Sequence, residues 1–198
     1  MSKIRIAILI SGRGSNMESL LQACTAPDFP AETAVVIANR PDAAGIAKAQ
    51  GYGIQTSIVD HRQYVGRAAF EEALQETLLK HAPVDLVCLA GFMRILTADF
   101  VNQWQDRMIN IHPSLLPDYK GLDTHARALA DGRAETGCTV HYVIPAMDEG
   151  PVIVQKRVPI LVGDTVDSLA ARVLAEEHQA YPEAVRIVAA RLSGLHRA

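Results

Sequence analysis

The chain has 198 residues and a formal net charge of −3, from 19 basic and 22 acidic side chains. Such a length suits one α/β domain that buries a sizeable core by itself. The balance of charge gives no bulk basic character and therefore argues against a nucleic-acid partner. No apolar stretch approaches the ~18 residues that a membrane-spanning helix needs, so no membrane partner is expected.

Three cysteines are present, at Cys24, Cys88 and Cys138. Their odd number and wide spacing predict neither a disulfide framework nor a zinc ribbon. Cys88 lies in an apolar run, where a cysteine usually acts as a small buried hydrophobic residue. We therefore expect a protein with reduced thiols in the cytoplasm.

Strand and helix signals alternate along the first half of the chain. The apolar run from Ile4 to Ile10 is typical of a strand buried on both faces of a parallel sheet, and a glycine turn follows it. Alternation of this kind predicts a doubly wound parallel sheet. The further elements expected here, with approximate bounds, are a helix at 16–24, a strand at 33–38, a helix at 43–49, a strand at 54–59, a helix at 61–80 and a strand at 85–90.

The second half of the chain changes pattern. The elements expected there are a short helix at 97–105 with Thr97 as its N-cap, strands at 107–111, 139–144 and 152–158, and a long helix at 165–192 kinked at Pro182. The loop between the last two strands is too short for a helical crossover, so these strands are expected to be antiparallel neighbours.

The fold class follows from these two patterns. We predict a single α/β domain over residues 1–198, with a mostly parallel, doubly wound sheet whose N-terminal half is Rossmann-like. An antiparallel strand pair belongs to the C-terminal half, and a long helix ends the chain.

A glycine loop separates the first strand from the first helix. Its sequence is Ser11-Gly12-Arg13-Gly14-Ser15-Asn16. Glycines let the backbone pass close to a ligand, and a helix N-terminus offers free N–H groups to an anion. A dinucleotide fingerprint would need a third glycine where Met17 stands, and no Walker lysine motif is present. The loop therefore suits a single phosphate better than NAD or ATP, and the alternative is an ordinary tight turn.

Asn110 and His112 lie at the end of the fifth expected strand, the edge of an open α/β sheet where ligands bind. In an extended segment both side chains point to the same side. One can donate a hydrogen bond to an oxyanion while the other moves a proton. Asp148, in the loop between the antiparallel strands, could orient and charge the histidine. The alternatives are a structural histidine and a solvated loop acid.

Glu177 lies near the middle of an apolar stripe on the last helix. The stripe, at helical spacing, is made of Val166, Leu169, Ala170, Val173, Tyr181, Ala184 and Val188. A carboxylate on a face that points to the core needs a partner or a ligand. An arginine in a structural ion pair and a substrate amine are both open as that partner.

Metal-site and hydrolase motifs are absent from the sequence. There is no H-E-x-x-H, no G-x-S-x-G and no H-x-E with C-x-x-C, and the seven histidines lack metal-ligand spacing. We therefore expect no catalytic metal.

Several segments in collinear order resemble the glycinamide ribonucleotide formyltransferases, folate-dependent enzymes of purine synthesis. The Asn-x-His-Pro-Ser-Leu-Leu-Pro stretch is shared by other enzymes that use 10-formyltetrahydrofolate, and the Ser-Gly-x-Gly-Ser-Asn loop narrows the choice. The matching segments are 10–16, 89–96, 110–117, Gly121-Leu122 to His125, Val140-His141, 147–151 and Glu176-Glu177-His178.

The resemblance implies an activity and a set of site residues. The enzyme would transfer the formyl group of the co-substrate 10-formyltetrahydrofolate to the amine of glycinamide ribonucleotide, by direct attack and through a tetrahedral oxyanion, without a metal. The catalytic residues would be Asn110, His112 and Asp148. The ribonucleotide would be held by Gly12, Arg13, Gly14, Ser15, Asn16 and Glu177. The folate pocket would comprise Arg67, Met93, Arg94, Ile95, Leu96, Asn110, Val143, Ile144, Met147 and Asp148.

The resemblance also divides the chain and leaves alternatives. Residues from about 1 to 100 would bind the nucleotide phosphate, and residues from about 101 to 198 would hold the catalytic and folate sites, in a monomer or a homodimer. Two departures are Asp123, where some members carry histidine, and Leu174, where some carry glutamine near the phosphate. A formyltetrahydrofolate hydrolase would share the catalytic trio with an added N-terminal domain, and a methionyl-tRNA formyltransferase would add a C-terminal RNA-binding domain. A non-catalytic nucleotide-binding module would keep the glycine loop but would not need the trio.

Overall fold

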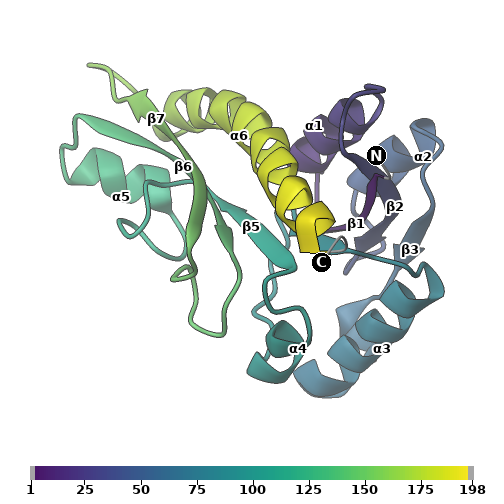
Figure 1. Cartoon of the computed structure of the whole chain (residues 1–198). Coiled ribbons are helices and arrows are strands. Elements are labelled where there is room, and N and C mark those ends of the chain that lie inside the picture. Colours follow the sequence, from purple (N-terminus) through teal and green to yellow (C-terminus); the bar gives the residue numbers. More distant parts are fainter. Residues whose placement is uncertain (1–2, 196–198) are drawn as a thin grey trace.

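The computed structural model describes residues 3–195, whose strands form one seven-stranded sheet in the order β3-β2-β1-β4-β5-β6-β7 (Figure 1). Strands β1 to β5 are parallel, whereas β6 is antiparallel to both β5 and β7. The strands are β1 (Ile4–Ile10), β2 (Ala31–Ala38), β3 (Thr56–Ile58), β4 (Leu86–Leu89), β5 (Met108–His112), β6 (Glu135–Tyr142) and β7 (Val152–Pro159).

Helices cover both faces of the sheet (Figure 1). They are α1 (Ser15–Cys24), α2 (Gly45–Gly51), the 3₁₀ turn η1 (His61–Gln63), α3 (Gly66–Lys80), α4 (Ala98–Gln103), α5 (Thr124–Ala130) and α6 (Val166–Leu195). Side chains of α1, α2 and α6 contribute to one apolar cluster, and those of α3 and α4 contribute to the other.

Strand β1 divides the two clusters, because successive side chains of a strand point to opposite faces. Ile6 and Ile8 lie in the cluster under α1 and α6, whereas Ala7 and Leu9 lie in the cluster under α3. All four are fully buried. This double burial explains why the first strand is an almost uninterrupted apolar run.

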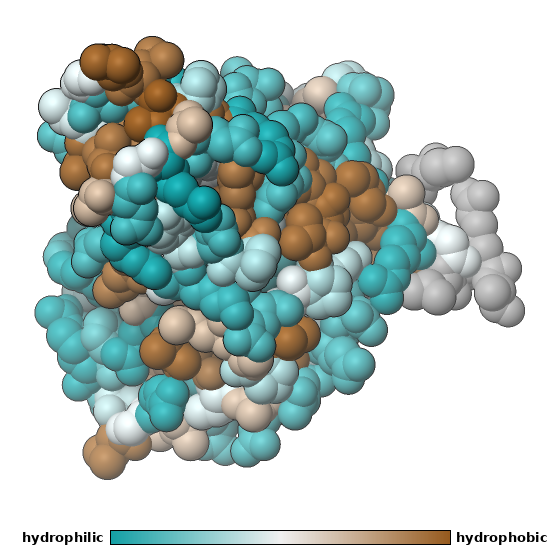
Figure 2. All heavy atoms as spheres, turned by 90° about the vertical axis from the view of Figure 1, so that its left-hand side faces the viewer, coloured by the Kyte–Doolittle hydropathy of each residue, from teal (hydrophilic) through white to brown (hydrophobic). Residues whose placement is uncertain are grey.

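Helix α6 crosses one face of the sheet from β7 to β2. Its buried residues pack with those of β1, β5, β6 and β7 in one cluster, and the hydroxyl of Tyr181 donates to the carbonyl oxygens of Leu89 (2.8 Å) and Ile109 (3.3 Å). The helix continues through Pro182, and its ribbon curves as it crosses the sheet (Figure 1). On the side that carries α5 and β7, apolar side chains form small separate groups on a mainly hydrophilic surface (Figure 2).

The predicted fold class is confirmed, including the antiparallel pair and the long last helix. Thr97 is the N-cap of α4, accepting a hydrogen bond from the N–H of Phe100. The expected continuous helix at 61–80 is wrong. Tyr64 and Val65 are extended and Gly66 has φ +84°, so a 3₁₀ turn and α3 are separate elements.

Two further corrections concern the second half of the chain. Helix α5 was not expected, because its seven residues bury only Thr124 and Ala128 and so carry no apolar period. Strand β6 begins at Glu135, four residues before the expected start at 139, and ends at Tyr142 rather than 144. From the sequence alone, a glycine at position 137 predicts an interruption of the strand. A Cβ on Gly137 would lie 1.9 Å from the carbonyl oxygen of Lys156, so glycine here permits close pairing with β7.

The remaining predicted bounds differ by a few residues. Helix α2 begins at Gly45 instead of 43 and ends at Gly51 instead of 49, and strand β3 spans only Thr56–Ile58 instead of 54–59. Ends of this kind depend on local hydrogen bonding, which apolar periodicity does not resolve.

Candidate active site

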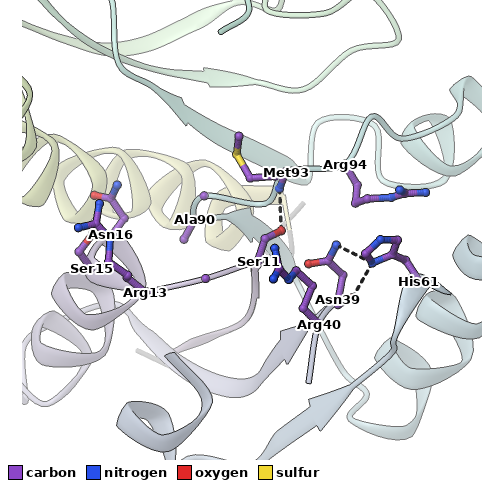
Figure 3. Close-up of a pocket in the computed structure, with 13 residues that line it drawn as sticks. Ser11, Arg13, Ser15, Asn16, Asn39, Arg40, His61, Ala90, Met93 and Arg94 are labelled. Atoms are coloured by element: carbon purple, nitrogen blue, oxygen red, sulfur yellow. Dashed lines mark hydrogen bonds between the residues drawn. The ribbon is translucent and has the colours of Figure 1, made fainter. Parts of the chain in front are cut away.

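The carboxyl ends of β1, β4 and β5 meet at one edge of the sheet, and the polar segments that follow them form the candidate site. The glycine loop after β1 is tied to the segment after β4 by two hydrogen bonds. The N–H of Ser11 donates to the carbonyl oxygen of Gly91 (3.2 Å), and the N–H of Met93 donates to Ser11 Oγ (2.7 Å). A pocket of about 530 Å³ lies between these segments (Figure 3).

The glycine loop is held in one conformation at the start of α1. The carbonyl oxygen of Gly12 accepts from the N–H of Gly45 (3.0 Å), and Gly14 has φ +70°, a backbone conformation that favours glycine. A Cβ on Gly14 would lie 3.0 Å from Gly45 Cα, whereas one on Gly12 would meet nothing within 4 Å. Gly14 is therefore required by the fold, and Gly12 leaves open space towards the pocket that it lines.

The opposite end of the same pocket has polar residues that the sequence analysis missed. Asn39, Arg40 and His61 line it, together with Arg94 (Figure 3). His61 Nδ1 donates to the carbonyl oxygen of Asn39 (2.8 Å), and Arg40 pairs with Asp42. Asn39 and Arg40 directly follow β2, and their position after a strand was the signal that could have identified them. That signal requires knowing that β2 is the neighbour of β1, which only the strand order of the structure gives.

His112 and Asp148 come together as expected. His112 Nδ1 lies 3.5 Å from Asp148 Oδ2, and both side chains are largely buried. The other ring nitrogen, Nε2, is 2.9 Å from the carbonyl oxygen of Tyr119, which can only accept, so Nε2 carries a proton. Asp148 has φ 55°, and its Oδ2 accepts from the N–H of Gly121 (2.9 Å), which fixes the carboxylate against the histidine.

Asn110 contacts a second buried histidine, His141, to which the sequence patterns gave no role. Asn110 Nδ2 lies 3.3 Å from Nε2 of His141, and that same nitrogen is 3.8 Å from Asp148 Oδ1. His141 Nδ1 is 2.9 Å from the carbonyl oxygen of Tyr142. Burial lowers the pKa of His141, which is only 2% exposed. Asp148 therefore lies between two histidines, one on β5 and one on β6.

Glu177 is buried on the apolar stripe of α6, 7% exposed. Its partner is Asn16 of the glycine loop, whose Nδ2 donates to Glu177 Oε2 at 2.6 Å. The arginine considered as a structural partner is therefore wrong. Burial raises the pKa of Glu177, and the hydrogen bond from Asn16 opposes that rise. Asn16 Oδ1 is buried without a hydrogen-bond partner, so the pair keeps an unused acceptor.

The expected folate-pocket residues divide into exposed and supporting side chains. Met93 and Ile95 are about two-thirds exposed, whereas Leu96 is buried and packs in one apolar cluster with Val143. That cluster joins the segment after β4 to the segment after β6. The other expected members are placed as follows: Ile144 and Met147 are exposed, Arg94 lies over the ring of Phe70, and Arg67 is exposed on the first turn of α3.

Neither a metal cluster nor a membrane span is found in residues 3–195. No group of three His, Cys, Asp or Glu side chains in that range could hold a metal ion. No helix in the same range has the length and apolar character to cross a membrane.

Comparisons with known proteins agree on the family. The family model described as formyl transferase matches residues 4–185. The chain is 42% identical to the phosphoribosylglycinamide formyltransferase of Escherichia coli (strain K12), over 90% of this chain and 84% of that protein. It is 44% identical to the trifunctional purine biosynthetic protein adenosine-3 of Gallus gallus over 95% of this chain. The chain spans only 19% of the length of that larger relative.

The fold agrees as well. The crystal structure of phosphoribosylglycinamide formyltransferase from Brucella melitensis superposes with a TM-score of 0.91 at 46% identity, covering 96% of this chain and 97% of that one. The residues that the family model matches, 4–185, include the glycine loop, the end of β5 and the loop after β6. The chain therefore belongs to the formyl transferase family, and within it to the phosphoribosylglycinamide formyltransferases.

Proposed function

We propose that the chain transfers the formyl group of 10-formyltetrahydrofolate to the amine of glycinamide ribonucleotide, a step of purine synthesis. The observation that carries the proposal is the meeting of Asn110, His112 and Asp148 at the carboxyl end of β5, at the same edge of the sheet as the glycine loop, in a chain of this family.

The glycine loop is the proposed phosphate site. The first N–H groups of α1 have no acceptor within the helix and favour an anion. Gly12 leaves the backbone open to the ligand, and Arg13, Ser15 and Asn16 line the same pocket. Glu177, joined to Asn16, would receive the glycinamide end of the ribonucleotide. Leu174 is half-buried on α6, so the phosphate has no glutamine there.

The proposed folate site lies between the segments that follow β4 and β6. Arg67, Met93, Arg94, Ile95, Leu96, Val143, Ile144 and Met147 would line it, with Asn110 and Asp148 at the reacting end. Exposed apolar side chains beside polar groups suit a flat aromatic ligand. The guanidinium groups of Arg67 and Arg94 suit a carboxylate at its far end.

The chemistry needs stabilisation of one oxyanion and transfer of one proton. The neutral amine attacks the formyl carbon, and the carbonyl oxygen becomes an oxyanion that Asn110 and His112 stabilise. The amine then loses a proton, N10 of the folate gains one, and the C–N10 bond breaks to release tetrahydrofolate. His112 Nε2 is occupied by Tyr119, so Nδ1, beside Asp148, is the atom available to exchange protons.

Formyl transfer to glycinamide ribonucleotide tests the proposal, with water and tRNA as alternative acceptors. His112→Ala and Asp148→Ala should each lower kcat by ~10²-fold or more while the fold is kept, because proton transfer by a positioned side chain contributes ~10²–10⁴-fold. Prolonged EDTA treatment should leave the rate unchanged. Release of formate without the ribonucleotide would instead indicate a hydrolase, and wild-type kcat in folded variants would remove both residues from the mechanism.

We further propose a domain division, a compartment and a class of partners for the chain. Residues 1–198 act as one formyltransferase domain, with the phosphate site in the half up to about 100 and the catalytic and folate sites mainly in the half after it. The chain works in the cytoplasm as a monomer or a homodimer, and its three free cysteines are compatible with a reducing compartment. Its partners are small-molecule substrates rather than nucleic acid or membrane.

A further inference from the structure

His141 of β6 is opposite Asn110 of β5 in the antiparallel register. Opposite side chains in such a pair lie on the same face of the sheet, close enough to interact. The pairing of β6 with β7 shifts by one residue between Val140 and His141. Gly150, in the loop between those strands, packs so closely that a Cβ would lie 1.7 Å from the carbonyl oxygen of Tyr142. The backbone around His141 is therefore tightly held.

The contacts of His141 determine which of its nitrogens carries the proton. Nδ1 is 2.9 Å from the carbonyl oxygen of Tyr142, which has only acceptor capacity, so Nδ1 must donate. In a neutral ring Nε2 then has no hydrogen and can only accept. Asn110 must therefore turn its NH₂ group, not its oxygen, towards Nε2 at 3.3 Å.

The charged groups around His141 decide whether the ring is neutral. Burial lowers its pKa, and the positive charge that His112 carries when protonated acts in the same direction. The hydrogen bond to Tyr142 and the carboxylate of Asp148, whose Oδ1 is 3.8 Å from Nε2, act against them. Asp148 has a shorter contact with His112, at 3.5 Å. A second imidazolium here would place two cations against one buried carboxylate.

We propose that neutral His141 is a positioning residue that holds the Asn110 amide with one N–H engaged and the other free for the formyl oxygen. This role rests on the proposed function, because Asn110 is given there the task of stabilising the oxyanion. An amide that could rotate by half a turn would present its carbonyl oxygen to the oxyanion and repel it. His141 prevents that rotation, because its Nε2 lone pair would then face the oxygen of Asn110.

Substitutions at His141 separate this role from simple core packing. His141→Gln can offer an amide oxygen near the position of Nε2, whereas His141→Phe fills the space without an acceptor. We expect His141→Phe to lower kcat by about 100-fold, the scale of a misplaced catalytic group, with little change in either KM. His141→Gln should recover most of that loss. His81→Phe, a substitution at a half-buried histidine at the end of α3, is the control and should keep the wild-type kcat.

A spectroscopic measurement makes the test independent of activity. In the folded wild-type protein, ¹⁵N chemical shifts of the histidine rings should identify His141 as the neutral form protonated at Nδ1. The side-chain NH₂ signal of Asn110 should move in His141→Phe and stay near its wild-type position in His141→Gln. An imidazolium or an Nε2-protonated ring at neutral pH would overturn the inference, as would a wild-type kcat in His141→Phe.

The two proposals fail in different ways. If the wild-type protein transfers no formyl group to glycinamide ribonucleotide, the proposed function fails, and the ring measurement still decides whether His141 holds Asn110. If the wild-type protein is active and the Gln and Phe variants lose kcat equally, the proposed function stands and the positioning role is overturned.

Discussion

Asp148 is the residue on which the geometry of the candidate site depends most. Its two carboxylate oxygens face different histidines, Oδ2 towards His112 and Oδ1 towards His141. Its left-handed backbone conformation is uncommon for a residue with a side chain and persists where surrounding contacts determine it. The hydrogen bond from the N–H of Gly121 supplies one such contact. The carboxylate is therefore placed by the loop before α5 as much as by its own loop.

Glu177 is the proposed contact for the glycinamide end of the ribonucleotide. Glu177→Gln keeps the shape and an acceptor for Asn16 but removes the charge. We expect kcat/KM for the ribonucleotide to fall by about tenfold or more, since a hydrogen bond to a charged group contributes ~1.5–3 kcal/mol. Steady-state kinetics with varied ribonucleotide measures this. Glu176→Gln, the same charge change on the neighbouring residue, is the control. An unchanged kcat/KM would remove Glu177 from the ribonucleotide site.

The stability difference between Glu177→Gln and the wild type should depend on pH. Because burial raises the folded-state pKa of Glu177 above its ordinary value of 4.5, the folded protein binds that proton more tightly than the unfolded chain. The native state therefore loses stability as pH rises from about that ordinary value through the raised pKa. Glu177→Gln escapes this loss, so its Tm should equal or exceed that of the wild type at neutral pH, with a difference that shrinks in acid. A lower Tm at neutral pH would contradict the argument.

At the scale of elements, the two glycines before α1 should have different roles, Gly12 in ligand binding and Gly14 in stability. Gly12→Val should leave Tm nearly unchanged, because nothing lies within 4 Å of an added Cβ, and should raise KM for the ribonucleotide by blocking backbone approach. Gly14→Ala should instead destabilise the protein by about 1–2 kcal/mol, because Gly14 has φ +70°. Thermal unfolding and KM for each substrate distinguish the two. A fall in folate affinity with an unchanged ribonucleotide KM in Gly12→Val would mean that the two subsites are exchanged.

The elements also show the limits of local patterns. Strand β1, helix α1 and the N-cap of α4 lie where apolar runs, glycines and Thr97 predict them, since these signals act within a few residues. Helix α5 and the first part of β6 escape such patterns. Helix α5 is too short to show a helical period. Strand β6 contains Gly137, and the need for glycine there comes from the backbone of β7, which is distant in sequence.

At the scale of the whole molecule, the two halves of the chain share one sheet and one helix. Strand β5 pairs with β4 on one side and β6 on the other, and the hydroxyl of Tyr181 on α6 donates to carbonyl oxygens of both β4 and β5. The division near residue 100 falls inside α4 and not in a linker of the kind that separates domains. The glycine loop and the three proposed catalytic residues therefore keep a fixed relation although they come from different halves.

We predict one cooperative unfolding transition for the whole chain. Trp104, the single tryptophan, is buried at the C-terminal end of α4, so its fluorescence reports one face of the sheet, while far-UV circular dichroism reports all helices. The two midpoints should coincide in denaturant. Tyr181→Phe should lower the stability by about 1 kcal/mol without separating them, because a buried hydrogen bond of this kind contributes ~0.5–1.5 kcal/mol. Two separate midpoints would mean that the halves fold as independent units.

The sequence by itself determined the alternation of strands and helices, the glycine loop before α1, and the candidates Asn110, His112, Asp148 and Glu177. These follow from residue type and from spacing along the chain, which are local properties. Only the tertiary structure decided that Glu177 is held by Asn16, that Asp148 lies between two histidines, and that His141 is opposite Asn110. Those pairs depend on strand order and register, which are set by the burial of whole faces of the sheet and not by neighbours in sequence.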